Sequence, residues 1–425
     1  MKTIELKGLD QNLYYDKLDN GLEVFLLPYS NKSNYTMHYI TKYGSIQTTF
    51  VPYDKKNKIT VPDGIAHFLE HKMFEQEDGI DPFTFASKTG TDSNASTNFE
   101  CTRYYFEGNQ AFKENLNYLL DFVGSPYFTD ENVEKEKGII AEEIKQYDDE
   151  VDWVFEEELK KALLQKDNHR VDIAGTVESI YKITKEDLYT TYYTFYQPSN
   201  MFIVISGDFN KEEALEIIKN NKTLQNAKTN FPIDVFQEKE PLEVNEKQVE
   251  IKFNVINTKV GYGIKIPLEN VKDKYLFSLY VGVMLNIKFG LSSYFREELK
   301  KEQLMTSFYM ERELIDNYLL INFKADSEVP EKLITKIKKE LENISVTEEE
   351  INRLKKVWIS SEVIMIDNIN MSLENIVGDI IEYGRVIPNK IDIYRSLNKK
   401  DYDNMLSNIN FNNSSVVIIR PKTKE

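Results

Sequence analysis

The chain has 425 residues, of which 41% are hydrophobic and 29% are charged, an ordinary balance for a globular protein. One hydrophobic core rarely grows beyond about 250–300 residues, so this length favours two domains. The net charge of −17 argues against nucleic acid or an anionic membrane as the main partner.

The cysteine count and the first ten residues bear on cellular location. The single cysteine, Cys101, excludes an intramolecular disulfide, which fits a reducing compartment. It lies in an alternating apolar segment, so we expect a packed core thiol rather than a nucleophile. Residues 1–10 are too charged for a secretory signal, and no segment approaches the roughly 20 uninterrupted apolar residues of a membrane span. We therefore expect a cytoplasmic protein.

The first elements are predicted to be strands. One covers residues 21–28 and follows an Asp-Asn-Gly turn, and a second covers about 35–42. Residues 51–63 are polar and rich in Lys, Asp and Pro, as expected of a loop. His38 falls in the second strand, where we expect a strand-face or core histidine rather than a metal ligand.

The stretch after this loop, residues 64–74, carries two histidines four positions apart. Positions i and i+4 share one face of a helix, so His67 and His71 can reach one small cation, and neutral imidazole is a good zinc ligand. Glu70 borders that face and can take a proton from an attacking water and pass it to a leaving amine. The order His-x-x-Glu-His inverts the commoner zincin string and keeps its geometry. The alternative is a structural helix that carries these residues by chance.

Periodicity and breakers predict the elements that follow. These are a short helix at 82–88, a strand or a pair of strands within 91–106, and a helix at 111–123. Thr129 and Asp130 are good N-caps for a further helix, which runs to Gln146.

This last helix offers a third metal ligand. Glu136 and Glu143 are seven residues apart, so two helical turns place them on one face. Ile139 and Ile140 are expected to pack the helix against the protein. A carboxylate on a neighbouring helix is a suitable third zinc ligand. The residues alone leave Glu142 as a competitor, because most glutamates of such an acidic helix are solvated.

The second half of the chain echoes the first. Residues 129–135 align with 347–353, and 187–205 align with 401–419 as a helix, an Asn-rich turn and an apolar strand. In this register Leu354 and Ser361 stand where the first half has its two spaced glutamates. The second half contains no histidine. The first copy therefore carries the chemistry and the second does not.

These features predict an α+β fold of two homologous domains from an internal duplication, each a mostly antiparallel sheet packed with helices. A polar stretch from 220 to 247, with two prolines, has the composition of a linker. The predicted domains are a zinc-binding catalytic domain at 1–222, a linker at 223–247 and an inactive homologous domain at 248–425.

The sequence resembles the insulinase/pitrilysin family of zinc peptidases, the inverzincins, and more narrowly its short bacterial subfamily of half-length chains. Residues 64–71 with Phe74 are similar to the family's zinc helix, and the two spaced glutamates to its Glu-x6-Glu pair. The resemblance implies Glu143 as the third zinc ligand and Glu136 as its support. His169, which precedes a Gly175-Thr176 segment, resembles a family position that is not a ligand.

A further family motif covers residues 94–104. It resembles the substrate-binding edge strand of the family, and the substrate-binding residues that it implies are Asn94, Ala95, Ser96 and Thr97. An extended substrate would pair with this strand through its backbone.

The second half departs from the family pattern. The family often carries an Arg and a Tyr there that help grip the substrate backbone, and our alignment puts Lys300 and Thr306 in their places. Lys lacks the planar fork of Arg, and Thr lacks the reach of a phenol. Arg296 lies four residues too early. The resemblance therefore implies a heterodimer enclosing a chamber, in which a homologous zinc-less partner supplies Arg and Tyr; the alternative is a homodimer.

These inferences together predict a zinc-dependent endopeptidase that cleaves peptides or unfolded segments. Zn²⁺ is the expected cofactor. A silent assembly subunit that retains its metal site is one rival, and a metal-dependent hydrolase of a non-peptide substrate is another.

Overall fold

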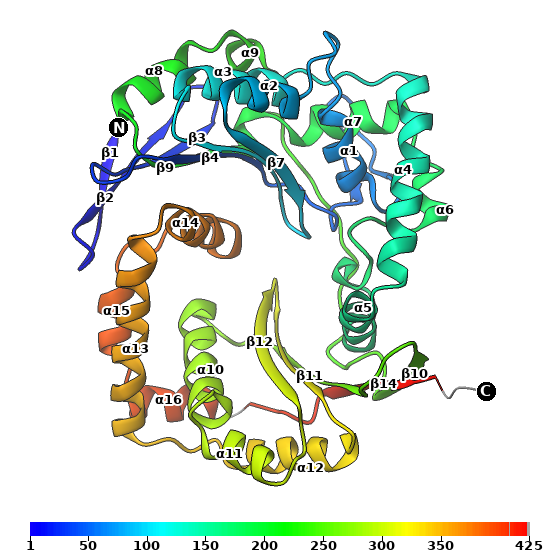
Figure 1. The fold of residues 1–425 in the computed structure, drawn as a ribbon, viewed down its shortest axis with the longest axis vertical. Helices are drawn as coiled ribbons and strands as arrows, with labels where there is room; N and C mark the ends of the chain where they lie inside the picture. Colours follow the sequence, from blue (N-terminus) through cyan, green and yellow to red (C-terminus); the bar gives the residue numbers. More distant parts are fainter. Residues whose placement is uncertain (408, 423–425) are drawn as a thin grey trace. The chain divides into compact units, whose positions relative to one another are not determined.

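The computed structural model describes residues 1–407 and 409–422 (Figure 1). The chain forms two compact units. The first combines Met1–Lys145, Val171–Gln237 and Glu362–Lys390, and the second combines Gln146–Arg170, Glu238–Ser361 and Ile391–Glu425.

The first unit is built on a seven-stranded sheet of order β1-β2-β3-β9-β4-β8-β7. Its strands are β1 (Lys2–Leu6), β2 (Gln11–Lys17), β3 (Glu23–Pro28), β4 (Tyr35–Thr41), β7 (Asp92–Thr97), β8 (Thr102–Gly108) and β9 (Met201–Gly207). Only the β3–β9 pair of this sheet is parallel. Two short strands, β5 (Thr49–Phe50) and β6 (Ile59–Thr60), pair separately.

The central strands of this sheet carry apolar side chains on both faces, so both faces are buried. Along β9, Ile203 and Ile205 belong to one core cluster and Phe202 and Val204 to another, as alternation along a strand requires. The helices of the unit are α1 (Ile65–Met73), α2 (Pro82–Thr89), α3 (Phe112–Val123), α4 (Asp130–Asp148), α6 (Val177–Ile180), α7 (Lys185–Phe195), α8 (Lys211–Asn220), α9 (Lys222–Asn226) and α14 (Ile369–Tyr383).

The second unit is built on a five-stranded sheet of order β10-β14-β11-β13-β12. Its strands are β10 (Gln248–Phe253), β11 (Lys259–Pro267), β12 (Ser307–Ile315), β13 (Tyr318–Asp326) and β14 (Ser414–Pro421). Its helices are α5 (Val151–Leu163), α10 (Lys274–Phe289), α11 (Tyr294–Lys301), α12 (Pro330–Leu341), α13 (Glu348–Ile366), α15 (Lys390–Ser396) and α16 (Lys399–Leu406).

The two sheets share one topology. The order β3-β9-β4-β8-β7 in the first corresponds to β10-β14-β11-β13-β12 in the second, and each run begins with its single parallel pair. Helices α4 and α13, which the sequence repeat aligns, each have 19 residues. The predicted α+β fold with two homologous, mostly antiparallel domains is confirmed.

The compact units differ from a division of the chain into 1–222, 223–247 and 248–425. Each unit takes a helical segment from the other half of the sequence: α14 packs on β9 and β4 of the first sheet, and α5 packs on β14, β11 and β10 of the second (Figure 1). Leu373 and Ile376 of α14 and Phe155 and Leu159 of α5 supply the buried contacts. Each sheet has a second apolar face, and these helices remove it from water.

Most predicted elements lie within one or two residues of their observed bounds. The region 91–106 is a hairpin of two strands, β7 and β8. The N-terminal hairpin β1–β2 has no counterpart among the predicted elements. The stretch 220–247 holds the short helix α9 and otherwise little regular structure up to β10.

One segment, Lys274–Lys301, is long and apolar enough to pass a length and composition test for a membrane-crossing helix. Some 67% of its most apolar window is buried within the protein, and the core helix of a globular protein passes the same test. It contains α10, which packs in the core of the second unit. This segment is therefore weak evidence for a membrane span.

Candidate metal centre

The helix that carries the two predicted ligands, α1, is held at its N-terminus by a close backbone approach. Gly64, its N-cap, has φ +87°, and a Cβ at this position would lie 2.3 Å from the carbonyl oxygen of Ala174. The hydroxyl of Ser179 donates to the carbonyl oxygen of Asp63 at 2.8 Å. Only glycine fits this position, so the contact with residues 174–179 fixes where α1 begins.

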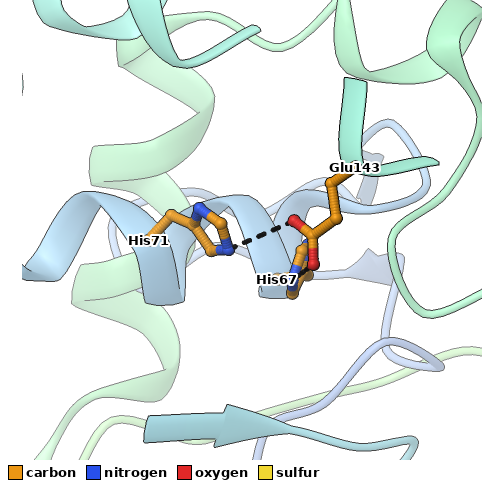
Figure 2. Close-up of side chains that lie close together, drawn as sticks. All are labelled: His67, His71 and Glu143. Atoms are coloured by element: carbon orange, nitrogen blue, oxygen red, sulfur yellow. Dashed lines mark ion pairs between the residues drawn. The ribbon is translucent and has the colours of Figure 1, made fainter. Parts of the chain in front are cut away.

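His67 and His71 lie one turn apart on α1 and face Glu143 of α4 (Figure 2). Nε2 of His67 is 3.8 Å from one carboxylate oxygen of Glu143, and Nε2 of His71 is 3.5 Å from the other. One ligand atom from each of the three residues lies within 4.8 Å of the other two. The structure therefore brings together the three residues that the sequence analysis nominated as ligands.

Glu136 orients His71 from the side opposite Glu143. Its carboxylate lies 3.0 Å from Nδ1 of His71. With the proton of a neutral imidazole on Nδ1, this hydrogen bond leaves Nε2 as a free lone pair directed at Glu143. Lys72 is fully buried, and its ammonium lies 2.7 Å from Glu75 and 3.7 Å from Glu136.

The pKa values of the two histidines are shifted in opposite directions. Burial lowers the pKa of His67 to about 3, with a further contribution from His71, so this imidazole is neutral. Burial also lowers the pKa of His71, but the hydrogen bond with Glu136 and the nearby carboxylates outweigh it and raise that pKa above its ordinary value. For Glu136, burial raises the pKa, and the contacts with His71 and Lys72 lower it overall.

The two competitors on α4 are separated by their orientation. Glu142 is 69% exposed and accepts from Lys145 at 2.6 Å, whereas Glu143 faces the histidines. The expected packing of two isoleucines is half wrong: Ile140 is fully buried, but Ile139 is 48% exposed. The helix is anchored instead by Val133, Ile140 and Ile144 on one face, because adjacent residues of a helix point about 100° apart.

Glu70 is 9% exposed and faces the edge strand β7. Its carboxylate accepts a hydrogen bond of 2.6 Å from the hydroxyl of Thr97. Burial raises the pKa of Glu70 above its ordinary value, and the Thr97 hydrogen bond partly offsets this rise. A carboxylate with a raised pKa beside two metal-ligand candidates is suited to act as a general base.

The residues predicted to bind substrate lie on β7, at the edge of the first sheet. Asn94 is exposed, and Ala95, Ser96 and Thr97 are half-buried. Arg103 of β8 braces this edge, since its Nε donates to Ser96 at 2.7 Å. The guanidinium also pairs with Glu374 of α14 at 2.6 and 2.7 Å. Strand β7 is therefore held from its inner side by β8, and no described strand pairs with its outer edge.

The remaining chemical candidates lie outside the cluster. His38 is buried, stacks on Tyr105 with ring centroids 4.7 Å apart, and has a pKa lowered to about 3 by burial. His169 lies in the second unit, where its Nδ1 is 2.6 Å from Asp167. Cys101 is buried, which raises its pKa to about 12 and leaves the thiol unreactive.

Lys300, Thr306 and Arg296 also lie in the second unit. All three line a cavity of about 790 Å³ there. The three residues therefore line one cavity of the second unit and do not form three separate surface sites.

Two connections in the first unit were missed from the sequence. The Thr97–Glu70 hydrogen bond joins an edge strand to a helix 27 residues away. The contact between Gly64 and residues 174–175 spans more than 100 residues. The sequence signal for the second contact was the pair of glycines, Gly64 before the histidine string and Gly175. Both have positive φ in the structure.

The cluster fits a zinc ion by its donor set. Zinc is commonly held in catalytic sites by two imidazole nitrogens and one carboxylate oxygen, with a fourth position for water or substrate. The neutral His67, the Glu136-oriented His71 and the half-exposed carboxylate of Glu143 supply those three donors. No other group of three His, Cys, Asp or Glu ligands converges in this way among residues 1–407 and 409–422.

Comparison with known proteins identifies the family. Residues 58–177 match the insulinase domain of peptidase family M16, and residues 182–357 match the M16 inactive domain. The chain is 42% identical over 295 residues to an uncharacterised zinc protease of Bacillus subtilis, YmfH, covering 69% of each chain. This chain belongs to peptidase family M16. The ligand candidates all fall within the insulinase match. The inactive-domain match begins in the first unit at residue 182 and ends at residue 357 in α13, so it covers four of the five strands of the second sheet and omits β14.

Solved structures agree with this assignment. A protein from Alicyclobacillus acidocaldarius described as an M16-like peptidase is 30% identical with a TM-score of 0.90, and the match covers 97% of this chain and 99% of that one. The periplasmic protease PqqL of Escherichia coli is 17% identical with a TM-score of 0.73, and the match covers 97% of this chain but 48% of that chain. The PqqL match shows the shared fold, and this chain spans about half the length of PqqL.

Proposed function

We propose that the chain is a zinc-dependent endopeptidase that cleaves peptides or unfolded segments. The observation that carries the proposal is the convergence of His67, His71 and Glu143 beside the buried carboxylate of Glu70. Relatives named zinc proteases support the peptidase class.

Each side chain has a definite task in this proposal. His67, His71 and Glu143 hold the cation, and Glu136 keeps His71 in the orientation that presents Nε2. Zinc, when bound, polarises a carbonyl group and lowers the pKa of water. Glu70 accepts a proton from the attacking water and delivers it to the leaving amine. Thr97 holds the Glu70 carboxylate by the 2.6 Å hydrogen bond.

The substrate class follows from the edge strand. An extended peptide can add to β7 through backbone hydrogen bonds, with Asn94 to Thr97 as its neighbours. Backbone pairing recognises an extended shape more than a particular sequence. This favours peptides and unfolded segments over folded proteins.

We also propose that a partner chain completes the active enzyme. Lys300 and Thr306 stand where the family often has Arg and Tyr, which supports a homologous zinc-less partner that supplies those residues and encloses a chamber with this chain. The PqqL chain is about twice as long as this one, which is consistent with two such halves working together. A homodimer is the alternative assembly. The buried, single Cys101 supports a cytoplasmic location.

The test combines zinc content and peptide cleavage in the wild-type chain and in Glu70→Gln. We expect one zinc per chain in both proteins, and a kcat lower by a factor on the order of 10²–10⁴ in Glu70→Gln, because general acid–base catalysis is lost. Glu77→Gln, an exposed residue just beyond α1, is the matched control and should cleave normally. Each protein is assayed alone and with a homologous zinc-less chain.

Activity that needs the second chain would support the shared site. Two other results would count against the proposal. Zinc without cleavage under every condition would favour a silent assembly subunit with a retained metal site. A folded chain without zinc would contradict the peptidase proposal.

A further inference from the structure

The cavity of about 790 Å³ in the second unit has a distinctive charge pattern. It is formed by the end of α10, helix α11, strand β12 and helix α13. Three cationic side chains line it, Arg296, Lys300 and Arg353, together with one carboxylate, Glu350. The chain as a whole carries a charge of −17, so this wall is locally opposite in sign to the protein.

The one carboxylate of the cavity is already engaged. Glu350 accepts from the backbone N–H of Thr347 at 2.7 Å and from its hydroxyl at 2.9 Å. This is the reciprocal arrangement of a capping box at the start of α13. Glu350 is therefore held at the helix end, and the three cations of the lining outnumber this one carboxylate.

The cations, in contrast, keep free donors. Lys300 and Arg353 are exposed, and their side chains have no ion pair or hydrogen bond with any residue in the described part of the chain. Arg296 is half-buried, with Nε donating to the carbonyl oxygen of Phe289 at 3.1 Å and the guanidinium 4.7 Å from the centre of the Phe308 ring. These contacts fix the Arg296 guanidinium on the cavity wall.

Apolar side chains surround these charges. Leu291, Tyr309 and Val357 are 84%, 68% and 54% exposed, respectively, and Met305 and Met310 also line the cavity. Large exposed side chains around a concavity are typical of a binding surface, and methionine adapts to varied ligand shapes. Strand β12 passes along the cavity and forms the outer edge of the second sheet, so backbone groups are available there.

We propose that this cavity binds a peptide carboxylate flanked by apolar side chains. The carboxylate, from an internal Glu or Asp or from a peptide C-terminus, lies among Arg296, Lys300 and Arg353, and the flanking side chains cover Leu291, Tyr309 and Val357. The edge strand β12 makes an extended peptide the fitting ligand class, and the unpaired cations make it an acidic one. Lys300 thus takes part in selecting acidic peptides.

This inference deepens the proposed peptidase function, and it rests on that function only for the statement that the bound peptide is a substrate. Binding itself is a separate property of the second unit. A binding assay therefore distinguishes the failure of the cavity from the failure of the peptidase.

The experiment measures fluorescence anisotropy with labelled ten-residue peptides and the full-length Glu70→Gln chain, which does not cleave them under the proposed function. Three peptides share one leucine-rich sequence: one has an internal Glu and an amidated end, one an internal Gln and an amidated end, and one an internal Gln and a free C-terminal carboxylate. We expect at least one of the two carboxylate peptides to bind at least fivefold more tightly than the neutral peptide. The peptide that shows this preference identifies the source of the carboxylate.

Two matched double variants locate the preference. Lys300→Gln with Arg353→Gln removes both unpaired cations from the cavity, and Lys301→Gln with Lys356→Gln removes the same charge from exposed neighbours on the same two helices that do not line it. The first pair should abolish the preference, and the second should retain it. All four side chains are exposed, so both variants should fold.

Several results would overturn the proposal. These are equal binding of all three peptides, no binding, a preference that survives in the Lys300 and Arg353 variant, and an equal loss in both double variants, which would indicate general charge attraction. Cleavage by the wild-type chain is measured separately on neutral peptides. Cleavage without a carboxylate preference would leave the peptidase intact, and a preference without cleavage would leave the cavity intact.

Discussion

The two units place different side chains on the same framework. In the first, α1 lies between β4 and β7 in the chain and carries His67, Glu70 and His71; in the second, α10 lies between the equivalent strands β11 and β12 and carries mostly apolar side chains. Helix α4 supplies Glu136 and Glu143, whereas the aligned positions of α13 are Leu354 and Ser361.

The comparison separates what the fold provides from what the residues provide. Both units have an edge strand, a helix beside it and a 19-residue helix in the aligned position. Only the first, among the described residues, gathers three metal-ligand side chains. The second has instead a basic, apolar-rimmed cavity. The metal centre is therefore a property of a few side chains on a duplicated scaffold.

The largest expected effect tests the packing that completes the first unit. Leu373 of α14 is fully buried against the first sheet, so Leu373→Ala should destabilise that unit by about 2–5 kcal/mol through lost burial and a cavity. Hydrogen exchange measured by mass spectrometry should show faster exchange in β4 and β9. Met371→Ala, a 46% exposed site on the same helix, is the control. Faster exchange confined to β11 and β14 would show that α14 is assigned to the wrong unit.

A smaller effect is expected when α4 is made to resemble α13 at one position. Glu136→Leu removes the carboxylate that orients His71 and should lower zinc affinity about 10–100-fold. Competition with a fluorescent chelator measures this affinity. Glu134→Leu, at a 67% exposed site two residues away, should retain the wild-type affinity. An equal loss in both variants would remove the specific role of Glu136.

The smallest expected effect concerns the link between β7 and the base. Thr97→Val removes the hydroxyl that favours the ionised form of Glu70 and should lower kcat about tenfold. A hydrogen bond to a charged group contributes ~1.5–3 kcal/mol. We expect the lower part of this range because the backbone of Thr97 also favours the ionised carboxylate and is unchanged in the variant. The pKa of Glu70 is already raised and should rise further. Since the base acts when ionised, the acid side of the kcat profile should move to higher pH.

Thr97→Ser keeps the hydroxyl and serves as the control for the same position. It should restore most of kcat and return the acid side of the profile toward its wild-type pH. A Thr97→Val enzyme with an unchanged pH profile and a raised KM would instead indicate contact with substrate alone.

The sequence was most informative where the determinants are local. The four-residue spacing of His67 and His71 and the seven-residue spacing of Glu136 and Glu143 follow from helical geometry, so their faces could be predicted. The sequence repeat predicted that the two halves share a fold, but it did not predict the order of the strands. The choice of Glu143 over Glu142 needed the family resemblance.

Contacts between distant segments could not be predicted in this way. The exchange of α5 and α14 between the halves depends on which apolar sheet face each helix covers, and neither helix differs in pattern from an ordinary amphipathic helix. The Thr97–Glu70 hydrogen bond depends on the twist and register of β7. In the sequence, Thr347 and Glu350 have the pattern of an ordinary helix cap. The sequence does not show that Lys300 and Arg353 line the same cavity as Glu350 without an ion pair among the described residues.

The most direct test of the metal centre is the zinc content of Glu143→Gln and Glu142→Gln, measured by elemental analysis beside the wild-type chain. The two glutamates are adjacent on α4, but only Glu143 faces the histidines, at 3.5 and 3.8 Å. We predict one zinc per chain in the wild type and in Glu142→Gln, and none retained by Glu143→Gln after dialysis. Retained zinc in Glu143→Gln, or equal loss from both variants, would contradict the ligand set on which the proposed function depends.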